Sequence, residues 1–468
     1  MRRLFGTRVH LPLPGGGSSG PVAASVETWA MALALSGLTL YLGYWAERSD
    51  FFSLSLAYGA FFALSLWVVR RVAFGQAAER HYLHLGIVLR MLLLFSLPHL
   101  SDDYFRFLWD GHLSAAGVHP FSSTPEQWMG EADAPSALMA YLYRQMNSPR
   151  YFTVYPPVCQ AVFWAAAKIS PYGIWGGVVV LKVFLLCCEV GSIRLLGRLA
   201  ALAPPDAPCP APSLQRHAAL LYALNPLCIL EIVGNLHFEG AMIAALLLGL
   251  LMLQQERAGA AGVAWAFSVA AKLVPLMFVP IVWAWLGWRR GMAFLGALTS
   301  AGVLLFAPLL DMQVWANMSR SMDLYFQKFQ FNASLYYFLR ALGVMRTGYD
   351  RGDIIGPALG LAVVLAVLAL AYVALRRRAA FSTLCAALMW ASFAHLTCSA
   401  VVHPWYVSLL LVLGLLAGWR FPLLWSAAVV LSYSHYWHGG AAEHFGWIAV
   451  EYAVVWIVLV WEWRRRRP

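Results

Sequence analysis

Residues 81–111 read HYLHLGIVLRMLLLFSLPHLSDDYFRFLWDG, twenty mostly apolar residues followed, after one serine, by two adjacent carboxylates. A run of that length is sufficient to cross a bilayer, which needs roughly 17–25 apolar residues in a helix. Asp102 and Asp103 therefore fall where a membrane helix is expected to end, and Arg106 and Asp110 follow shortly after. This stretch predicts a spanning helix that delivers an acidic cluster to one membrane surface.

The whole chain has the composition of a polytopic membrane protein. Of its 468 residues, 61% are hydrophobic and 12% are charged, and the mean hydropathy is +0.65. Soluble proteins carry about 25% charged residues, so half of the usual solvated surface is missing. The net charge of +11 does not indicate nucleic-acid binding, because the arginines stand in gaps between apolar runs. Seven cysteines without CxxC spacing predict neither a disulfide framework nor a zinc site.

Placing every arginine-rich gap in the cytoplasm orients the chain. We predict an all-α bundle of about 12 spans with both termini inside and a large external loop after the third span. Residues 156–170 are too short for a span and are expected to form an interfacial helix. Residues 259–288, broken at the sequence KLVP, are expected to form a re-entrant hairpin. The predicted spans are 28–46, 51–69, 83–100, 174–198, 217–236, 239–255, 292–309, 354–375, 381–398, 405–418, 422–436 and 445–463.

This topology divides the chain into a cytoplasmic tail, two added N-terminal helices, a catalytic membrane module, a C-terminal membrane module and a basic cytoplasmic tail. The catalytic module carries an external loop at 101–155, and the C-terminal module carries one at 311–353. The five parts cover residues 1–26, 27–80, 81–290, 291–463 and 464–468. Most unusual polar residues then face away from the cytoplasm, where ATP and nucleotide sugars are not directly accessible.

The acidic cluster has a structural and a catalytic interpretation. Asp102 or Asp103 alone can simply cap a helix at the membrane surface. However, Arg106 and Asp110 follow Asp102 at i+4 and i+8, so the three side chains are expected near one helical face. Adjacent carboxylates raise each other's pKa, and a nearby cation that keeps one ionised produces a general base. We therefore predict a catalytic role for at least one of the two aspartates.

Cations within apolar runs need partners, because each costs roughly 2.5–3.5 kcal/mol at mid-bilayer on insertion scales. Arg90 and Lys182 are expected to pair with Glu189 or Glu231. Lys272 stands at the break in the re-entrant hairpin, where it either snorkels or reaches a lipid phosphate.

Further polar residues are expected on the external face. His237 and Glu239 lie in a tight gap between two spans, as structural groups or as substrate ligands, and no metal-binding spacing surrounds them. Cations are normally depleted on this face, so those in the loop 311–353 indicate an anionic ligand such as phosphate. The candidate substrate-binding residues of these loops are Tyr155, Arg320, Lys328, Arg340, His403 and Tyr406.

These motifs resemble the GT-C membrane glycosyltransferases, and most closely their bacterial polyprenyl-phosphate-mannose-dependent mannosyltransferases. The resemblance rests on SDDYFRFLWDGHLSAAGVHPF, YPPVCQAVF, NLHFEG, AAKLVPLMFVP, FNASLYYFLR and HPWY, spread over residues 90–406. It implies a GT-C-like bundle in the bacterial cytoplasmic (inner) membrane, with the active site on the external, periplasmic face. The implied partners are a polyprenyl-phosphate sugar donor, a lipid or glycan acceptor and membrane lipid, without nucleic acid.

The resemblance also implies roles for individual residues. Asp102 or Asp103 is the general base for an inverting displacement that transfers one hexose, and mannose is the sugar expected. Arg106 and Asp110 shape the site, while His237 and Glu239 line the acceptor side. Arg320, Lys328, Arg340 and His403 are the phosphate candidates. Two features depart from the family pattern: two extra helices precede the acids, and the acids are adjacent rather than spaced as D-x-D, so we expect no required metal or other cofactor.

Two other classes of protein remain as alternatives. A transporter or lipid flippase is favoured by the isolated membrane cations Arg90, Lys182 and Lys272, but such proteins show internal repeats and a charged midplane site. We find no repeat between the halves of the chain, and the polar residues crowd one face. An O-antigen ligase or membrane acyltransferase is the second alternative, although a ligase typically has its large loop late in the chain.

Overall fold

The computed structural model describes residues 26–131, 135–202, 212–309, 311–377 and 380–466, and for residues 212–213, 322–328 and 377 it describes the backbone alone. Throughout these ranges the chain is helical, apart from turns and one isolated parallel bridge between Phe331 and Val401. The predicted all-α class is therefore confirmed for the part of the chain that the structure describes.

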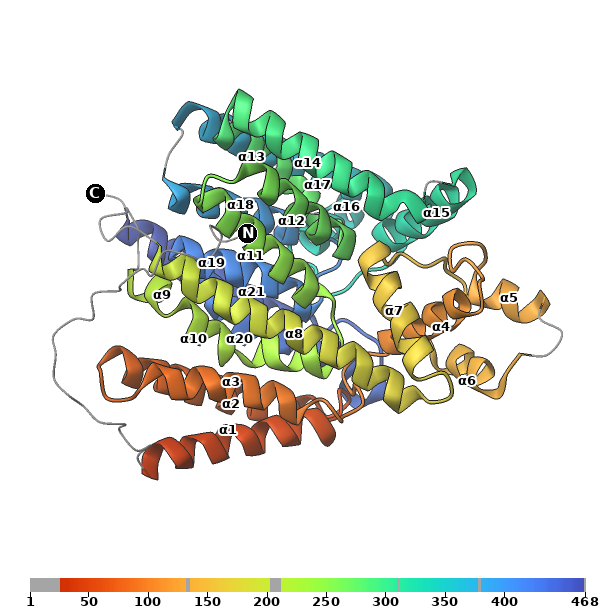
Figure 1. Cartoon of the computed structure of the whole chain (residues 1–468), viewed down its shortest axis with the longest axis horizontal. Helices are drawn as coiled ribbons and strands as arrows, with labels where there is room; N and C mark the ends of the chain where they lie inside the picture. The colour runs from red at the N-terminus through yellow and green to blue at the C-terminus, as the bar shows by residue number, and fades with distance from the viewer. Residues whose placement is uncertain (1–25, 132–134, 203–211, 310, 378–379, 467–468) are drawn as a thin grey trace, which may run out of the picture.

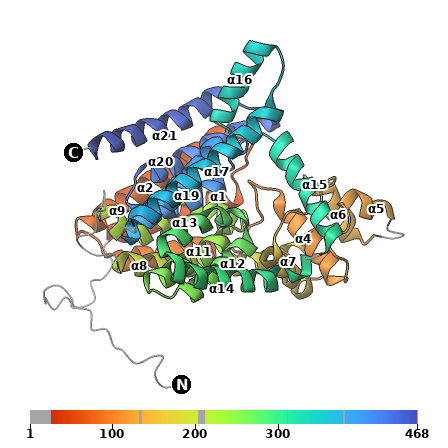
Figure 2. The ribbon, with the colours of Figure 1, turned by 90° about the horizontal axis from the view of Figure 1, so that it is seen from above.

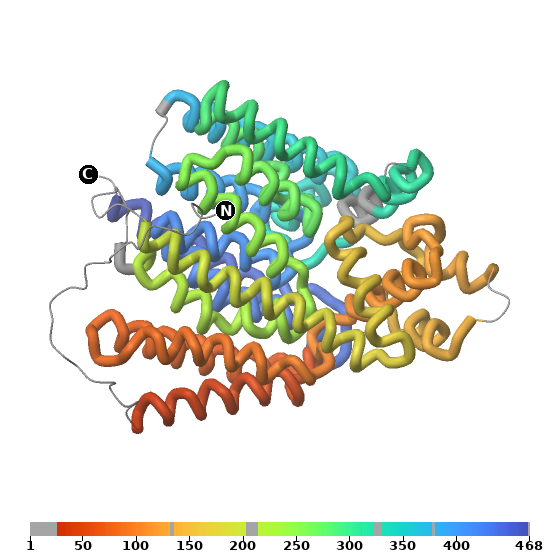
Figure 3. Tube along the Cα trace, in the orientation of Figure 1, coloured from red at the N-terminus to blue at the C-terminus, as the bar shows by residue number. Residues whose placement is uncertain are grey.

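The helices run back and forth along one bundle with two distinct ends (Figure 1). The turn between α2 (Phe51–Ala73) and α3 (Glu79–Leu92), the short helix α9 (Pro212–Arg216) and the C-terminal end of α21 (Phe445–Arg465) lie at one end. The tube trace in Figure 3 follows the same course. A cap of shorter helices lies at the other end. This cap comprises α4 (Asp103–Ala115), α5 (Pro125–Glu131), α6 (Ala137–Gln145), α7 (Pro157–Ile169) and α15 (Met312–Lys328).

Six of the described helices are long and apolar enough to cross a membrane. A seventh span results if the π-helix η1 (Cys228–Gly234) and α11 (Glu239–Gln254), which meet at a bend of 111°, form one broken span. The chain is therefore an integral membrane protein, whereas the count of about 12 spans stays a prediction. The six helices are α1 (Val26–Tyr44), α2 (Phe51–Ala73), α14 (Trp288–Phe306), α17 (Gly352–Arg377), α18 (Phe381–Cys398) and α21 (Phe445–Arg465).

Other passes along the bundle are short or interrupted. The helix α8 (Ile174–Ala201) runs the length of the bundle, but α10 (Ala218–Ala223), α19 (Val407–Ala417) and α20 (Phe421–Ala428) are brief. A 3-10 helix, η5 (Val429–Gly439), continues from α20. Seen from above, α16 (Leu335–Thr347) projects away from the bundle (Figure 2).

Two local predictions have different outcomes. The KLVP sequence breaks its segment as expected, because α12 (Ala258–Ala271) ends directly before Lys272 and the 3-10 helix η2 (Val274–Phe278) leads into α13 (Val279–Leu286). The predicted span 83–100 is wrong at its end, since α3 (Glu79–Leu92) stops eight residues earlier and turns follow. Pro98 is incompatible with a continuing helix, because its ring removes a backbone donor.

The two buried cations in the membrane part have found partners. The Nε of Arg90 donates to Oε2 of Glu189 at 2.8 Å, with both side chains fully buried, so this predicted pair is confirmed. The Nζ of Lys182 instead donates to the carbonyl of Leu93 and to Oγ of Ser96, each at 2.8 Å. These contacts tie α3 and the turns after it to α8 and give both cations a structural role.

Candidate active site

A cavity of about 530 Å³ lies at the end of the bundle that carries the cap, a size typical of small-molecule sites. It is bounded by segments from Arg48 to Tyr436, and three helices, α4, α7 and α11, begin beside it. Helix N-termini carry partial positive charge, which favours anionic groups. The predicted site residues that line it are Asp102, Asp103, Arg106, Tyr155, His237, Glu239, Lys272, His403 and Tyr406.

The two adjacent aspartates have different surroundings. Asp102 is the N-cap residue of α4, and its Oδ2 lies 2.6 Å from Nη2 of Arg48. Asp103 is the first residue of the helix, and its Oδ1 accepts a hydrogen bond from Nδ2 of Asn147 at 3.3 Å. Burial raises the pKa of the Asp103 carboxyl above its usual value, while Asn147 and Lys272 oppose the rise. Asp103 is therefore a carboxylate with an increased affinity for protons.

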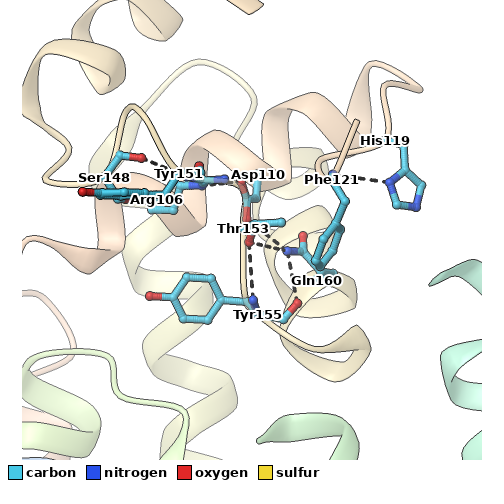
Figure 4. A network of polar contacts seen from close by, with 9 residues as sticks. All are labelled: Arg106, Asp110, His119, Phe121, Ser148, Tyr151, Thr153, Tyr155 and Gln160. Carbon is cyan, nitrogen blue, oxygen red and sulfur yellow. Dashed lines mark hydrogen bonds and ion pairs between the residues drawn. The ribbon is translucent and has the colours of Figure 1, made fainter. Parts of the chain in front are cut away.

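Arg106 anchors the loop that closes one side of the cavity (Figure 4). Its Nε donates to Oδ1 of Asp110 at 2.8 Å, and its Nη1 donates to the carbonyls of Ser148 at 3.2 Å and Tyr151 at 2.8 Å. The other oxygen of Asp110 accepts from Nε2 of Gln160 at 3.0 Å. Arg106 and Asp110 thus share a face as predicted, but Asp102 faces Arg48 because it precedes the helix.

The return segment is held from its other side by α7. Gln160 lies within hydrogen-bonding distance of Oγ1 of Thr153 at 3.2 Å and of the carbonyl of Tyr155 at 3.4 Å (Figure 4). The two phenylalanines Phe107 and Phe163 stack at 4.7 Å, and the ring of Tyr155 contacts both edge-on. The YPP sequence therefore directs Tyr155 to the cavity wall, where Pro156 caps α7.

A lysine–glutamate pair lies at the break between α12 and η2. The Nζ of Lys272 pairs with Oε1 of Glu239, the first residue of α11, and lies 4.6 Å from the centre of the Tyr406 ring. Glu239 is almost fully buried, whereas 29% of the Lys272 side chain is exposed. Lys272 therefore presents a positive charge to the cavity close to the acidic pair.

Two histidines sandwich a tryptophan on the cavity wall. The ring of Trp405 stacks on His237 at 3.5 Å and on His403 at 4.4 Å, with interplanar angles of 15° and 8°. Burial, together with the nearby charge of Lys272, lowers the pKa of His403 to about 3. The pKa of His237 lies well below its usual value for the same reasons. Both imidazoles are thus neutral near pH 7, so His403 is a hydrogen-bonding group rather than a cation.

Among the described side chains of the loop 311–353, the predicted cations Arg320 and Arg340 lie away from the cavity lining. Arg340 pairs with Oδ2 of Asp350 at 2.6 Å and with Gln330 at 2.7 Å. Arg320 is exposed on α15, and the side chain of Lys328, the last residue of α15, lies outside the described part. The structure therefore does not bring Arg320 and Arg340 together with the aspartates, and the placement of Lys328 stays a prediction.

Arg48 is a site residue that the sequence analysis missed. It lies in the short connection between α1 and α2, pairs with Asp102 and packs over the ring of Tyr436 at 4.7 Å. The signal was present, because Arg48 is a cation after the first predicted span, on the side where positive charge is normally depleted.

The bundle contains several helices that are apolar and long enough to cross a membrane. At one end it has a cavity whose lining includes two adjacent carboxylates and a lysine. These features define a polytopic membrane protein with a reaction or binding site at one end. The chain belongs to a family described as "Alpha-(1->6)-mannopyranosyltransferase, N-terminal domain", whose profile matches residues 17–287, more than half of the chain. The resemblance to GT-C mannosyltransferases is thereby confirmed. The match includes α1 and α2, so these helices belong to the family region.

Two curated relatives have the same description. Alpha-(1->6)-mannopyranosyltransferase A of Mycobacterium tuberculosis is 26% identical over 249 residues, which are 51% of this chain and 44% of the relative. Alpha-(1->6)-mannopyranosyltransferase B of Corynebacterium glutamicum is 24% identical over 161 residues, which are 34% of this chain and 24% of the relative. The alignments thus span less than half of each relative's length.

Proposed function

We propose that this protein is a membrane mannosyltransferase that moves one mannose from a polyprenyl-phosphate donor to a hydroxyl group of a glycan or lipid acceptor. The observation that carries the proposal is the single cavity in which Asp102, Asp103 and Lys272 meet. The names of the two relatives support mannose as the sugar. The position of the cavity in a membrane bundle supports a donor with a lipid tail.

The proposed reaction is one displacement at the anomeric carbon. One of the aspartates accepts the proton of the acceptor hydroxyl as its oxygen attacks that carbon. The bond from the anomeric carbon to the phosphate oxygen breaks, and the lipid phosphate leaves with the electron pair, so the configuration inverts. General-base assistance of this kind typically contributes about 10²–10⁴-fold in rate.

The remaining side chains divide between the two substrates. Lys272 offers its charge to the leaving phosphate, and His403 contributes a neutral hydrogen-bonding ring beside it. His237 and Glu239 line the acceptor side, while the walls contain Tyr155 and Tyr406. Arg106 and Asp110 hold the loop that closes the cavity. The cations Arg320 and Arg340 would then meet the donor at the membrane surface rather than at the reacting bond, and Lys328 remains a candidate ligand of the donor phosphate.

We place the active site on the external face of the bacterial cytoplasmic membrane. The distribution of arginines supports this orientation, because the arginine-rich turn between α2 and α3 and the arginine-bearing helix α9 lie at the end of the bundle opposite the cavity (Figure 1). A site on that face depends on a lipid-linked donor, since nucleotide sugars stay in the cytoplasm. We propose no required metal. One oxygen of each aspartate is bonded, that of Asp102 to Arg48 and that of Asp103 to Asn147.

The test uses the full chain in proteoliposomes with an extracted acceptor glycolipid and one of two labelled donors. Polyprenyl-phosphate [³H]mannose is expected to label the acceptor, whereas GDP-[³H]mannose added alone is not. Labelling from GDP-mannose in the absence of lipid donor would contradict the proposed donor class. Movement of the lipid donor between leaflets without any transfer would instead establish the flippase alternative.

A further inference from the structure

The connection between α1 and α2 reaches into the cavity at the opposite end from the basic turns. Its Arg48 contributes to the lining and points its Nη2 at Asp102. The connection is fixed by its neighbours, since the amide of His438 donates to the carbonyl of Ser49 at 3.3 Å. Phe51, at the start of α2, packs against Trp437 and Trp447 with ring centres 6.0 and 5.1 Å apart. Arg48 is thus held in place rather than free at the surface.

This contact makes the two aspartates chemically unequal. At 2.6 Å, Oδ2 of Asp102 forms a short, charge-assisted bond with the guanidinium, so that oxygen is engaged. Asp103 is bonded to the neutral amide of Asn147 at the longer distance of 3.3 Å. The carboxylate with the weaker, uncharged partner is the one that is free to accept a proton.

We infer that Arg48 is a positioning residue that neutralises and fixes Asp102, and that Asp103 is therefore the general base of the transfer. The inference rests on the proposed function and deepens it, because it divides the roles within the acidic pair. It also gives α1 and α2 a part in the active site, in place of the peripheral addition that the sequence suggested.

The electrostatic surroundings of Asp103 make the inference measurable. The charged groups that act on its carboxyl are Asp102 from its own helix start, Glu239 from α11 and Lys272 after α12, and the titratable hydroxyl of Tyr436 in η5 also faces it. Arg48, from the α1–α2 connection, acts through its pairing with Asp102. In the native site the charges of Asp102 and Arg48 cancel. Removing Arg48 leaves a net negative charge beside Asp103, whereas removing the charge of Asp102 leaves a net positive one.

The experiment measures the pH dependence of donor-saturated transfer by the full chain in proteoliposomes. The variants are Arg48→Gln, Arg48→Lys, Asp102→Asn, Asp103→Asn and the double variant Arg48→Gln/Asp102→Asn. We expect Asp103→Asn to lose transfer by at least about 100-fold. The acidic limb of the pH–rate profile is the low-pH range in which transfer falls because the general base becomes protonated. We expect this limb to move to higher pH by about 1 unit in Arg48→Gln and to lower pH in Asp102→Asn. The double variant should return the limb to the wild-type position, and Arg48→Lys should keep it there.

Glu47→Gln is the matched control, because Glu47 is exposed next to Arg48 and its carboxylate accepts a local bond from Oγ of Ser49. Its pH profile should equal that of the wild type. An unmoved acidic limb in Arg48→Gln, with a raised donor KM, would overturn the inference and make Arg48 a donor ligand.

Two results for the aspartates separate this inference from the proposed function. Loss of transfer in Asp102→Asn with transfer retained in Asp103→Asn would reverse the assignment and leave the proposed function intact. Full transfer in both single variants would overturn the carboxylate mechanism itself.

Discussion

Arg106 is expected to be the main structural support of the cavity loop, and Arg106→Met tests this directly. The wild-type side chain is 3% exposed and joins Asp110, which is fully buried, to two carbonyl groups of the return segment. Methionine fills much of the same volume but provides no donor, so the buried carboxylate of Asp110 keeps only the amide of Gln160.

The size of the destabilisation follows from the burial of the Arg106–Asp110 ion pair. Breaking a buried ion pair by removing one partner costs about 3–5 kcal/mol, because the other charge is left uncompensated. The carbonyls of Ser148 and Tyr151 lie near the surface and can bind water, so their loss adds little. We therefore expect about 4 kcal/mol, which is close to a 1,000-fold change in the unfolding equilibrium.

Unfolding in detergent micelles measures the change in the free energy of unfolding. Hydrogen exchange measures the local loosening of the loop, which should appear as faster exchange across residues 147–153. Arg150→Met is the control from the same segment, because the Arg150–Glu126 pair is 77% and 51% exposed and such surface pairs contribute little. The double variant Arg106→Met/Asp110→Leu should recover much of the stability, since it removes both charges. A stable Arg106→Met protein, or a double variant less stable than the single one, would refute the reasoning.

Four further predictions concern the site and its packing. Asn147→Ala removes a hydrogen bond that lowers the pKa of Asp103, so the acidic limb of the pH–rate profile should move to higher pH. Lys272→Met should raise the donor KM at least about 10-fold, while Lys272→Arg keeps it within a few-fold. EDTA should leave transfer unchanged. Gly262→Ala should cost about 1–3 kcal/mol on thermal unfolding, because its new methyl group would lie 2.3 Å from the carbonyl oxygen of Phe294, whereas Gly259→Ala has open space.

Each of these predictions has a contradicting result. An acidic limb that moves to lower pH in Asn147→Ala would exclude the assigned hydrogen bond. A donor KM unchanged by Lys272→Met would separate Lys272 from the phosphate, and loss of transfer in EDTA that Mg²⁺ or Mn²⁺ restores would establish a metal requirement. Equal unfolding temperatures for the Gly262→Ala and Gly259→Ala proteins would contradict the close approach of α12 and α14.

The sequence predicted the helices well because their signals are local. Apolar run length, flanking arginines and prolines are all readable within a short window, and they located α18 at 381–398 and the break after α12. The end of α3 was missed because the residues after Leu92 stay apolar, and only Pro98 and Ser96 indicate that the helix has stopped. Hydropathy alone does not distinguish a helix from apolar turns.

The sequence predicted most of the residues that line the candidate site, but not which of them contact each other. His237 and Trp405 are separated by more than 160 residues, yet they stack at 3.5 Å, and no periodicity relates them. The charge of Arg340 made it a reasonable candidate for binding phosphate. In the structure, however, Arg340 forms an ion pair with Asp350, ten residues further along the chain. Arg48 was overlooked because α1 and α2 were interpreted as an N-terminal addition. Only the fold shows that the connection between these two helices lies beside the aspartates.

The account depends most on the two carboxylates as the site of proton acceptance. The most direct measurement is single-turnover transfer of [³H]mannose from polyprenyl-phosphate mannose by the Asp102→Asn/Asp103→Asn protein, with its folding verified by thermal unfolding in the same micelles. The account predicts a rate at least about 100-fold below that of the wild type, with the donor still bound. A near-wild-type rate would contradict it.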